Sequence, residues 1–166
     1  MRPLRGRVWK FGDNVDTDVI VPGKYLDAPL EESSLHVFES IRPGFAGEVR
    51  EGDIIVGGAN FGCGSSRENA PEALKALGIG CVVAESFGRI FFRNSIALGL
   101  PAVICEKVSE KFEDADTALV KLEEAVVENV TRGDSSASEP LSDEMLLILD
   151  AGGIVNVLRN MMGGEV

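Results

Sequence analysis

The clearest pattern of apolar and polar positions lies in the centre of the chain, where short apolar runs alternate with amphipathic segments. The apolar runs cover residues 53–58, 80–84 and 102–105. Each has the length of a strand that is buried on both faces. The amphipathic segments cover residues 71–77 and 87–98, and each is followed by a glycine that can end a helix. This order predicts a parallel sheet with short links and right-handed helical crossovers.

The flanking segments predict further strands and a helical end. At the N-terminus, residues 5–11 are expected to form one short strand, and the apolar residues before the turn at Pro22 and Gly23 a second one, with an Asp/Asn-rich loop between them. A short helix is predicted over residues 31–40. The last third predicts strands over 118–122 and 126–130, a Ser-rich loop over 133–139, and helices over 143–150 and 154–162. The expected fold class is therefore α/β, a central parallel sheet flanked by helices with extra strands from the N- and C-terminal segments.

Length and composition favour one folded domain that spans residues 1–166. The chain has 166 residues, of which 45% are hydrophobic and 26% charged, and its mean hydropathy is +0.10, which is ordinary globular composition. The net charge of −11 opposes nonspecific binding to nucleic acid or to an anionic membrane. The N-terminus resembles no signal peptide, and no apolar run approaches the ~18 residues of a membrane span. We therefore expect a cytoplasmic protein with neither kind of partner.

The charge is uneven along the chain. Residues 1–60 carry a net charge of −3, residues 61–105 of +1, and residues 106–166 of −9. An anion would therefore be repelled least in the middle third, although a core-rich segment also carries few charges for purely structural reasons. The three cysteines, Cys63, Cys81 and Cys105, form no C-x-x-C pair and predict neither a disulfide framework nor a metal site within this chain. Cys81 and Cys105 lie in apolar runs and are expected to be packed thiols.

A glycine-rich segment follows the first central strand. Residues 57–68 read GGANFGCGSSRE. Cys63 stands where a phosphate-binding loop requires lysine, and Arg67 stands where the dinucleotide fingerprint requires its last glycine, so both motifs fail. What the segment does indicate is a loop of small residues at the carboxyl end of a parallel strand, leading into a helix whose free N–H groups attract anions. The alternative is a tight turn with a serine that caps the helix.

Four segments together resemble a known family. They are DNVDTD at residues 13–18, PGKYL at 22–26, NFGCGSSRE at 60–68 and ESFGRIFFRN at 85–94. This combination is similar to the small subunits of 3-isopropylmalate dehydratase, the detached swivelling domain of the aconitase superfamily, over essentially the whole chain. The resemblance implies a β/β/α swivelling domain and half of an active site. The Lewis acid, a four-iron four-sulfur cluster, would be carried by a separate large subunit, without which this chain would be inactive.

The resemblance also implies roles for individual residues. Ser65 would be the base that removes a substrate proton, and Asp18 would orient catalytic groups. Ser66 and Arg67 would hold a substrate carboxylate, for which the planar guanidinium of Arg67 is suited. The reaction would dehydrate a 2-hydroxy diacid to an alkene and rehydrate it at the neighbouring carbon. Around residues 60–68 and 22–34 we expect the large subunit to dock.

The loop after Tyr25 would contact the variable group of the substrate. Its residues are Lys24, Tyr25, Leu26, Asp27 and Ala28. In the family, members of the homoaconitase type have an arginine at the position of Asp27. That arginine pairs with an extra carboxylate of their substrate. Asp27 would instead repel this carboxylate. We therefore favour 2-isopropylmalate as substrate. Substrates of the 2,3-dimethylmalate, citramalate and homoaconitate types stay open, as does a module that binds an anion without catalysis.

Other polar residues in the chain are assigned no site. His36 is the only histidine and has no partner cluster in the sequence, so we do not expect it to be a ligand. Arg89 and Arg93 lie one turn apart on a predicted helix and are expected on a solvated face. We attribute Cys63 to the geometry of its loop. Asn69, which replaces a histidine found in many relatives, affects none of the assigned roles, and self-association of the isolated chain stays open.

Overall fold

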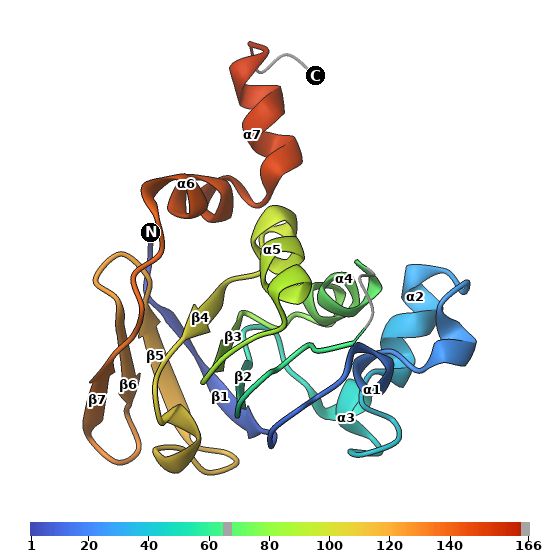
Figure 1. Ribbon diagram of the computed structural model, residues 1–166, viewed down its shortest axis with the longest axis horizontal. Coiled ribbons are helices and arrows are strands. Elements are labelled where there is room, and N and C mark those ends of the chain that lie inside the picture. The colour runs from blue at the N-terminus through green and yellow to red at the C-terminus, as the bar shows by residue number, and fades with distance from the viewer. Residues whose placement is uncertain (65–67, 164–166) are drawn as a thin grey trace.

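In the computed structural model, residues 1–64 and 68–163 are described, and they form one seven-stranded mixed sheet with helices along it (Figure 1). The strands are β1 (Leu4–Lys10), β2 (Ile54–Gly57), β3 (Cys81–Ala84), β4 (Ala102–Ile104), β5 (Thr117–Lys121), β6 (Val126–Asn129) and β7 (Asp134–Ala137). The helices are α1 (Thr17–Ile20), α2 (Leu30–Ser33), α3 (Phe45–Glu48), α4 (Asn69–Ala76), α5 (Arg89–Leu98), α6 (Asp143–Ala151) and α7 (Ile154–Met161), with 3₁₀ turns at Gly23–Tyr25, Ser34–His36 and Val108–Glu110. The strand order is β4-β3-β2-β1-β5-β6-β7.

The parallel half of the sheet confirms the central prediction. β1, β2, β3 and β4 pair in parallel, with Ile54 opposite both Val8 and Cys81. α4 connects β2 to β3 and α5 connects β3 to β4. Every residue of β2 and β3 is buried, because both faces of this half are covered.

The antiparallel half curls over one face of the parallel half. β1 pairs antiparallel with β5, and β6 and β7 continue the meander. Val83 of β3 shares a buried apolar cluster with Val120 of β5 and Val127 of β6. Ile55 and Val82 face a different cluster, which contains Leu74 of α4. The layers are therefore helices, parallel sheet and antiparallel sheet, which is the expected β/β/α arrangement.

The C-terminal helix α7 projects from the body of the molecule (Figure 1). None of its residues is buried, and Val155, Leu158 and Met161 are each more than half exposed. Among the described residues, no helix is both long and apolar enough to cross a bilayer.

Three local predictions were wrong. The apolar residues before Pro22 form helix α1 and not a strand, because the Asp16 side chain caps the backbone N–H of Asp18 and starts a helical turn. Residues 31–40 form only a four-residue helix followed by a 3₁₀ turn. The Ser-rich stretch 133–139 contains strand β7, whose backbone pairs with β6 although its side chains are mostly exposed.

Polar side chains link elements that are distant in the sequence. The Nζ of Lys75 in α4 donates to the carbonyl oxygens of Leu98 (2.6 Å) and Gly152 (3.1 Å), at the carboxyl ends of α5 and α6. The buried Asp116 carboxylate accepts from the Asn129 amide and the Glu113 N–H, both at 2.9 Å. Burial opposes ionisation, but these bonds and the charges of nearby cations outweigh it and lower the pKa of Asp116.

Candidate functional site

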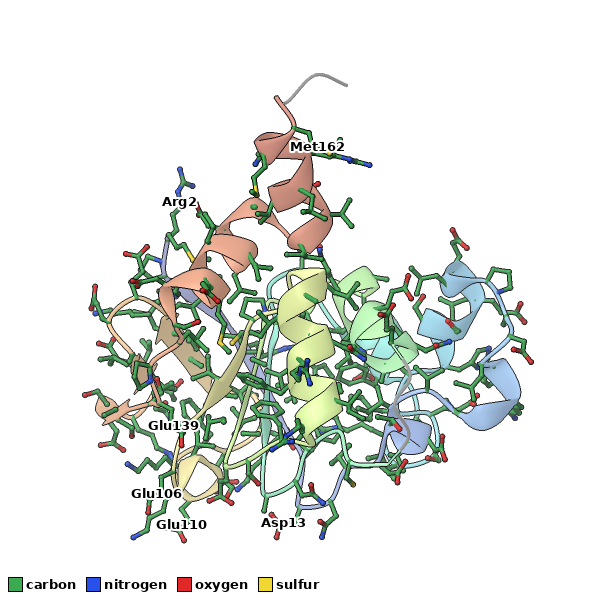
Figure 2. The ribbon with its side chains drawn as sticks, turned by 45° about the horizontal axis from the view of Figure 1, so that its top comes forward. Arg2, Asp13, Glu106, Glu110, Glu139 and Met162 are labelled. Atoms are coloured by element: carbon green, nitrogen blue, oxygen red, sulfur yellow. The ribbon has the colours of Figure 1, made fainter. Side chains whose placement is uncertain are left out.

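Loops that follow the parallel strands meet at one edge of the sheet. Residues 11–18 follow β1, residues 58–64 follow β2 and residues 85–88 follow β3. Figure 2 shows Asp13 and Glu106, which follow β1 and β4, along the same lower edge of the molecule, while Met162 lies at the opposite end. Ligands of parallel sheets bind at this edge, outside the carboxyl ends of the strands. The fold therefore brings three of the four family-like segments together.

Backbone and side-chain hydrogen bonds fix the loops after β1 and β2 to each other. The Asp13 carboxylate accepts from the Ala59 N–H at 2.8 Å. The Asn14 N–H donates to the Ala59 carbonyl at 2.8 Å, and the Asn60 amide donates to Asn14 Oδ1 at 3.2 Å. Asn14 and Asn60 both have positive φ, of 54° and 58°, a conformation that asparagine tolerates better than most residues. The predicted Asp/Asn-rich loop is thus an ordered support for the glycine-rich loop.

The loop after β3 holds the glycine-rich loop from the other side. The N–H of Asn60 donates to the Ser86 hydroxyl at 2.7 Å, and the N–H of Gly88 donates to the Phe61 carbonyl at 2.9 Å. Phe61 is fully buried, and its ring lies edge-on to that of Phe91 in α5. Gly62 lies so close to Phe91 that a Cβ there would overlap the ring. The small residues of this loop are therefore required by close packing.

Asp18 directly follows the residues that contact the end of the glycine-rich loop. Asp16 and Cys63 pair as an isolated parallel bridge, and the predicted catalytic residues Asp18 and Ser65 each follow two positions later in the chain. Asp18 is exposed, as a group that contacts substrate or partner must be. The predicted residues Ser65, Ser66 and Arg67 lie outside the described residues. Helix α4 begins at Asn69, and no side-chain hydrogen bond caps it at Glu68.

The specificity loop, by which we mean residues 24–28, consists of a 3₁₀ turn that begins at Gly23 and of the turns that follow it. The Tyr25 and His36 rings stack with their centroids 3.7 Å apart, and the Lys24 amine lies 5.1 Å from the Tyr25 ring centroid. His36 also pairs with Glu39 at 3.1 Å, and its ring thereby supports that of Tyr25. Leu26 and Ala28 are half-buried, whereas Lys24 and Asp27 are exposed. Asp27 forms no ion pair with any described residue, so no cation among them neutralises its negative charge.

Sequence reasoning missed two residues that organise this region. The Asn69 amide, in the first turn of α4, donates to the Leu26 carbonyl at 3.0 Å. It thereby ties the specificity loop to the helix that follows residues 65–67. Nothing in the sequence near Asn69 indicates this long-range bond. Asp16 was the other, and a local signal existed for it, since an aspartate directly before a short apolar segment is a common helix cap.

Two arginines and one thiol near these loops have distinct electrostatic surroundings. Arg89 and Arg93 of α5 are exposed, as expected, and neither forms an ion pair within residues 1–64 and 68–163. Arg89 follows Gly88, the residue that bonds to the Phe61 carbonyl, so one free cation lies at the start of α5 beside the loop edge. Burial and the nearby Asp16 carboxylate raise the pKa of the half-exposed Cys63 thiol. Cys63 is therefore disfavoured as a nucleophile.

The described residues offer no ligand set for a metal or an iron–sulfur cluster. No three of their His, Cys, Asp and Glu side chains come together as a metal site would require. Cys81 and Cys105 are buried, as predicted, and burial raises the pKa of both thiols.

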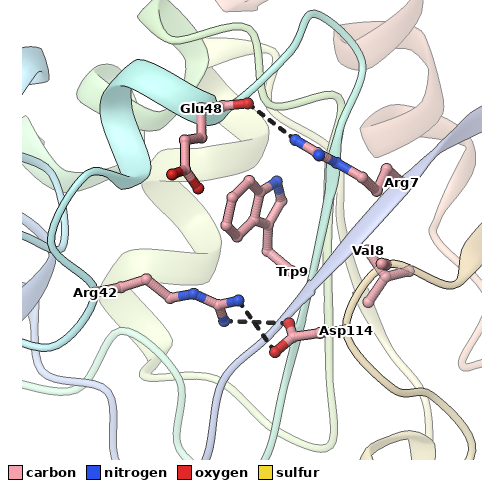
Figure 3. A pocket seen from close by; sticks show the side chains of 7 residues that line it. Arg7, Val8, Trp9, Arg42, Glu48 and Asp114 are labelled. Atoms are coloured by element: carbon pink, nitrogen blue, oxygen red, sulfur yellow. Dashed lines mark hydrogen bonds and ion pairs between the residues drawn. The ribbon is translucent and has the colours of Figure 1, made fainter.

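A separate hollow of about 210 Å³ lies beside Trp9, away from these loops (Figure 3). The guanidinium groups of Arg7 and Arg42 lie on either side of the Trp9 ring, each 4.8 Å from its centroid. Arg42 pairs with Asp114 at 3.0 Å, and Arg7 pairs with the buried Asp53 at 3.1 Å. Because each cation already has a carboxylate partner, we interpret the stack of Arg7, Trp9 and Arg42 as structural, and the hollow beside it not as an anion site.

Comparison with known proteins agrees with this geometry. The family described as Aconitase C-terminal domain matches residues 46–106, which include the glycine-rich loop. A 3-isopropylmalate dehydratase small subunit of Methanopyrus kandleri is 54% identical over 94% of this chain and 92% of its own length. The chain belongs to the family of 3-isopropylmalate dehydratase small subunits. A crystal structure of 3-isopropylmalate dehydratase from Methanocaldococcus jannaschii superposes with a TM-score of 0.91, at 40% identity, over 97% of this chain and 96% of that one.

Membership of the family does not by itself identify the substrate. A methanogen homoaconitase small subunit of Methanothermobacter thermautotrophicus is also 54% identical, over 92% of this chain and 89% of its own length. Relatives named for two different reactions are thus equally similar. Overall identity therefore does not distinguish between the two named reactions.

Proposed function

We propose that this chain is the small subunit of a 3-isopropylmalate dehydratase, which converts 2-isopropylmalate to 3-isopropylmalate for leucine biosynthesis together with a large subunit. The observation that carries the proposal is the edge where the loops after β1, β2 and β3 meet, with Asp18 beside the backbone that leads into GSSRE. The relatives named as small subunits support a large-subunit partner. The surface around residues 60–68 and 22–34 is our candidate for docking of the large subunit. Leu35, which directly follows the second range, is 65% exposed.

The proposed roles follow the similarity in sequence. Ser65 takes a proton from the carbon adjacent to the one that loses the hydroxyl group, and Ser66 and Arg67 hold a carboxylate of the diacid. Asp18 orients these groups from the neighbouring loop. Departure of hydroxide calls for a Lewis acid. Since the described residues provide no ligand set for one, we propose that the large subunit holds a four-iron four-sulfur cluster for this purpose.

The charge of Asp27 supports a substrate without a third carboxylate. Asp27 is exposed and has no cationic partner among the described residues. Two like charges about 5 Å apart at an effective dielectric constant of about 40 repel by roughly 1.7 kcal/mol, which is more than tenfold in binding. Isopropylmalate and the methylated malates escape this repulsion. Homocitrate, which carries the extra carboxylate, does not.

The test is anaerobic reconstitution with the large subunit, following the absorbance of the alkene intermediate. 2-Isopropylmalate, homocitrate, 2,3-dimethylmalate and citramalate are offered in parallel. We expect turnover of 2-isopropylmalate, a loss of several orders of magnitude in Ser65→Ala, and a raised KM with lowered kcat in Arg67→Lys. Ser135→Ala, on the exposed strand β7, is the matched control and should be unaffected.

Two results would contradict the proposal in different ways. Near-normal turnover in Ser65→Ala would remove Ser65 as the base. No turnover of any of the four diacids, with the cluster verified as intact, would favour a module that binds an anion without catalysis. Preference for a methylated malate would keep the reaction and change the pathway.

A further inference from the structure

The carboxylate of Asp16 lies between Asp18 and the end of the glycine-rich loop. On one side, Asp16 Oδ1 accepts from the backbone N–H of Asp18 at 2.8 Å and caps helix α1. On the other side, the carboxylate rests on Gly64. A Cβ added to Gly64 would lie 2.6 Å and 2.7 Å from the two carboxylate oxygens. One side chain thus contacts both segments.

Main-chain bonds hold the same two segments in register. The N–H of Thr17 donates to the Cys63 carbonyl at 2.8 Å, and the N–H of Gly62 donates to the Val15 carbonyl at 2.7 Å. The parallel bridge between Asp16 and Cys63 lies between these bonds. A shift of the β1 loop would therefore move the backbone that leads to Gly64 as well.

The contacts of Asp16 require its oxygen atoms and its position more than its charge. The side chain is half-buried and forms no ion pair with any residue of the described ranges 1–64 and 68–163. A capping bond needs only an acceptor oxygen, which asparagine provides equally well. Capping and charge can therefore be separated by substitution.

We propose that Asp16 is a positioning residue of the dehydratase site, which fixes Asp18 relative to the Gly62–Gly64 backbone. Its geometry rests on described contacts, and its effect on turnover rests on the function proposed above. Loss of the cap releases α1 and lets Asp18 move against the loop. Displacement of a catalytic group by about 1 Å can cost about 10²-fold in rate.

The kinetic test compares Asp16→Ala and Asp16→Asn in the complex with the large subunit. We expect Asp16→Ala to lower kcat by about 10- to 100-fold with KM changed by less than about 3-fold, because orientation and not binding is lost. Asp16→Asn should stay within about 3-fold of the wild type. The matched control is Ser142→Ala, because the Ser142 side chain also caps a helix, α6, by accepting a backbone N–H, from Met145 at 3.2 Å, and lies outside the loops of the site. It should keep kcat within about 3-fold.

Amide hydrogen exchange in the same complexes gives a readout that is independent of activity. Asp16→Ala should speed exchange at the N–H groups of Asp18 and Gly62, and Asp16→Asn should not. The proposal is overturned if Asp16→Ala keeps kcat within 3-fold, if Ser142→Ala or Asp16→Asn loses as much as Asp16→Ala, or if exchange at the two amides is unchanged. Absence of wild-type turnover would refute the proposed function alone, since exchange would still decide whether Asp16 holds the two segments.

Discussion

Gly64 offers the sharpest test of how tightly the site is packed. Its φ of +102° lies in a region that residues with a Cβ rarely adopt, and the Asp16 carboxylate occupies the space beside its Cα. Gly64→Ala therefore adds two costs, one of backbone strain and one of overlap. Gly133, between β6 and β7, separates them, because its φ is +77° and a Cβ there would meet nothing within 4 Å.

The expected loss of unfolding free energy in Gly64→Ala depends on how the overlap with Asp16 is relieved. Backbone strain costs about 1–2 kcal/mol at either glycine. In Gly64→Ala the Asp16 side chain can also swing away, which gives up its capping bond to Asp18 at a cost of about 1 kcal/mol. We expect Gly64→Ala to cost about 2–3 kcal/mol of unfolding free energy by this route, and Gly133→Ala about 1–2 kcal/mol. At about 2–4 °C per kcal/mol for a domain of this size, the Tm values should differ by roughly 2–4 °C.

The assay is urea denaturation of the two variants, of Asp16→Ala and of the double variant Gly64→Ala/Asp16→Ala. In the Asp16→Ala background the cap is already lost, so Gly64→Ala should cost only its strain, which leaves a coupling of about 1 kcal/mol. Additive costs within about 0.3 kcal/mol, or equal destabilisation by Gly64→Ala and Gly133→Ala, would refute the contact between Asp16 and Gly64.

Three further substitutions test other contacts. Asn69→Ala should change the ratio of kcat/KM between 2-isopropylmalate and citramalate by about 5-fold, since the specificity loop loses a hydrogen bond worth about 1 kcal/mol; an unchanged ratio would separate Asn69 from specificity. Lys75→Met should lower the Tm by roughly 2–6 °C through loss of both carbonyl contacts. Lys107→Met should not, because the exposed Lys107 amine forms no hydrogen bond or ion pair with a described residue; equal Tm values for the two variants would contradict this. Asp116→Asn should cost about 1–2 kcal/mol in urea denaturation at pH 7. Because the folded-state pKa of Asp116 is lowered, its contribution is present above the unfolded pKa of about 3.9 and is lost as the pH falls through the folded value; a gap between wild type and variant that stays constant from pH 5 to pH 3 would contradict this.

The parallel core was predictable because its strands are buried on both faces. Continuous apolar runs such as residues 80–84 have few alternatives once helices of suitable length separate them. Strand β7 was missed for the opposite reason. Its polar side chains face solvent, and it is held by backbone pairing with β6, which leaves no trace in hydropathy. Helix α1 was missed because the apolar residues before Pro22 fit a strand as well as a helix, and the Asp16 cap decides between them.

The candidate site shows a similar division between local and long-range information. The glycine-rich loop and Asp18 were identified from local segments, and the structure places them at one edge because the strands before them are parallel neighbours. The bond from Asn69 to Leu26 spans 43 positions, and no periodicity or local motif reports a contact of that kind. Predicting it requires the packing of α2 against α4.

Overall sequence similarity does not identify the substrate, whereas the geometry of the specificity loop bears on it. Relatives named for isopropylmalate and for homoaconitase activity share the same identity with this chain, so overall similarity cannot distinguish the two. We propose that a few adjacent features distinguish them, namely the unpaired charge of Asp27, the stacked Tyr25, and the bond from Asn69 to Leu26, which lies between them in the chain. If selectivity resides there, a change of one charge in the loop alters the substrate without touching the support at Asp16 and Gly64. Reaction type and substrate preference would then be separable properties of the same edge of the sheet.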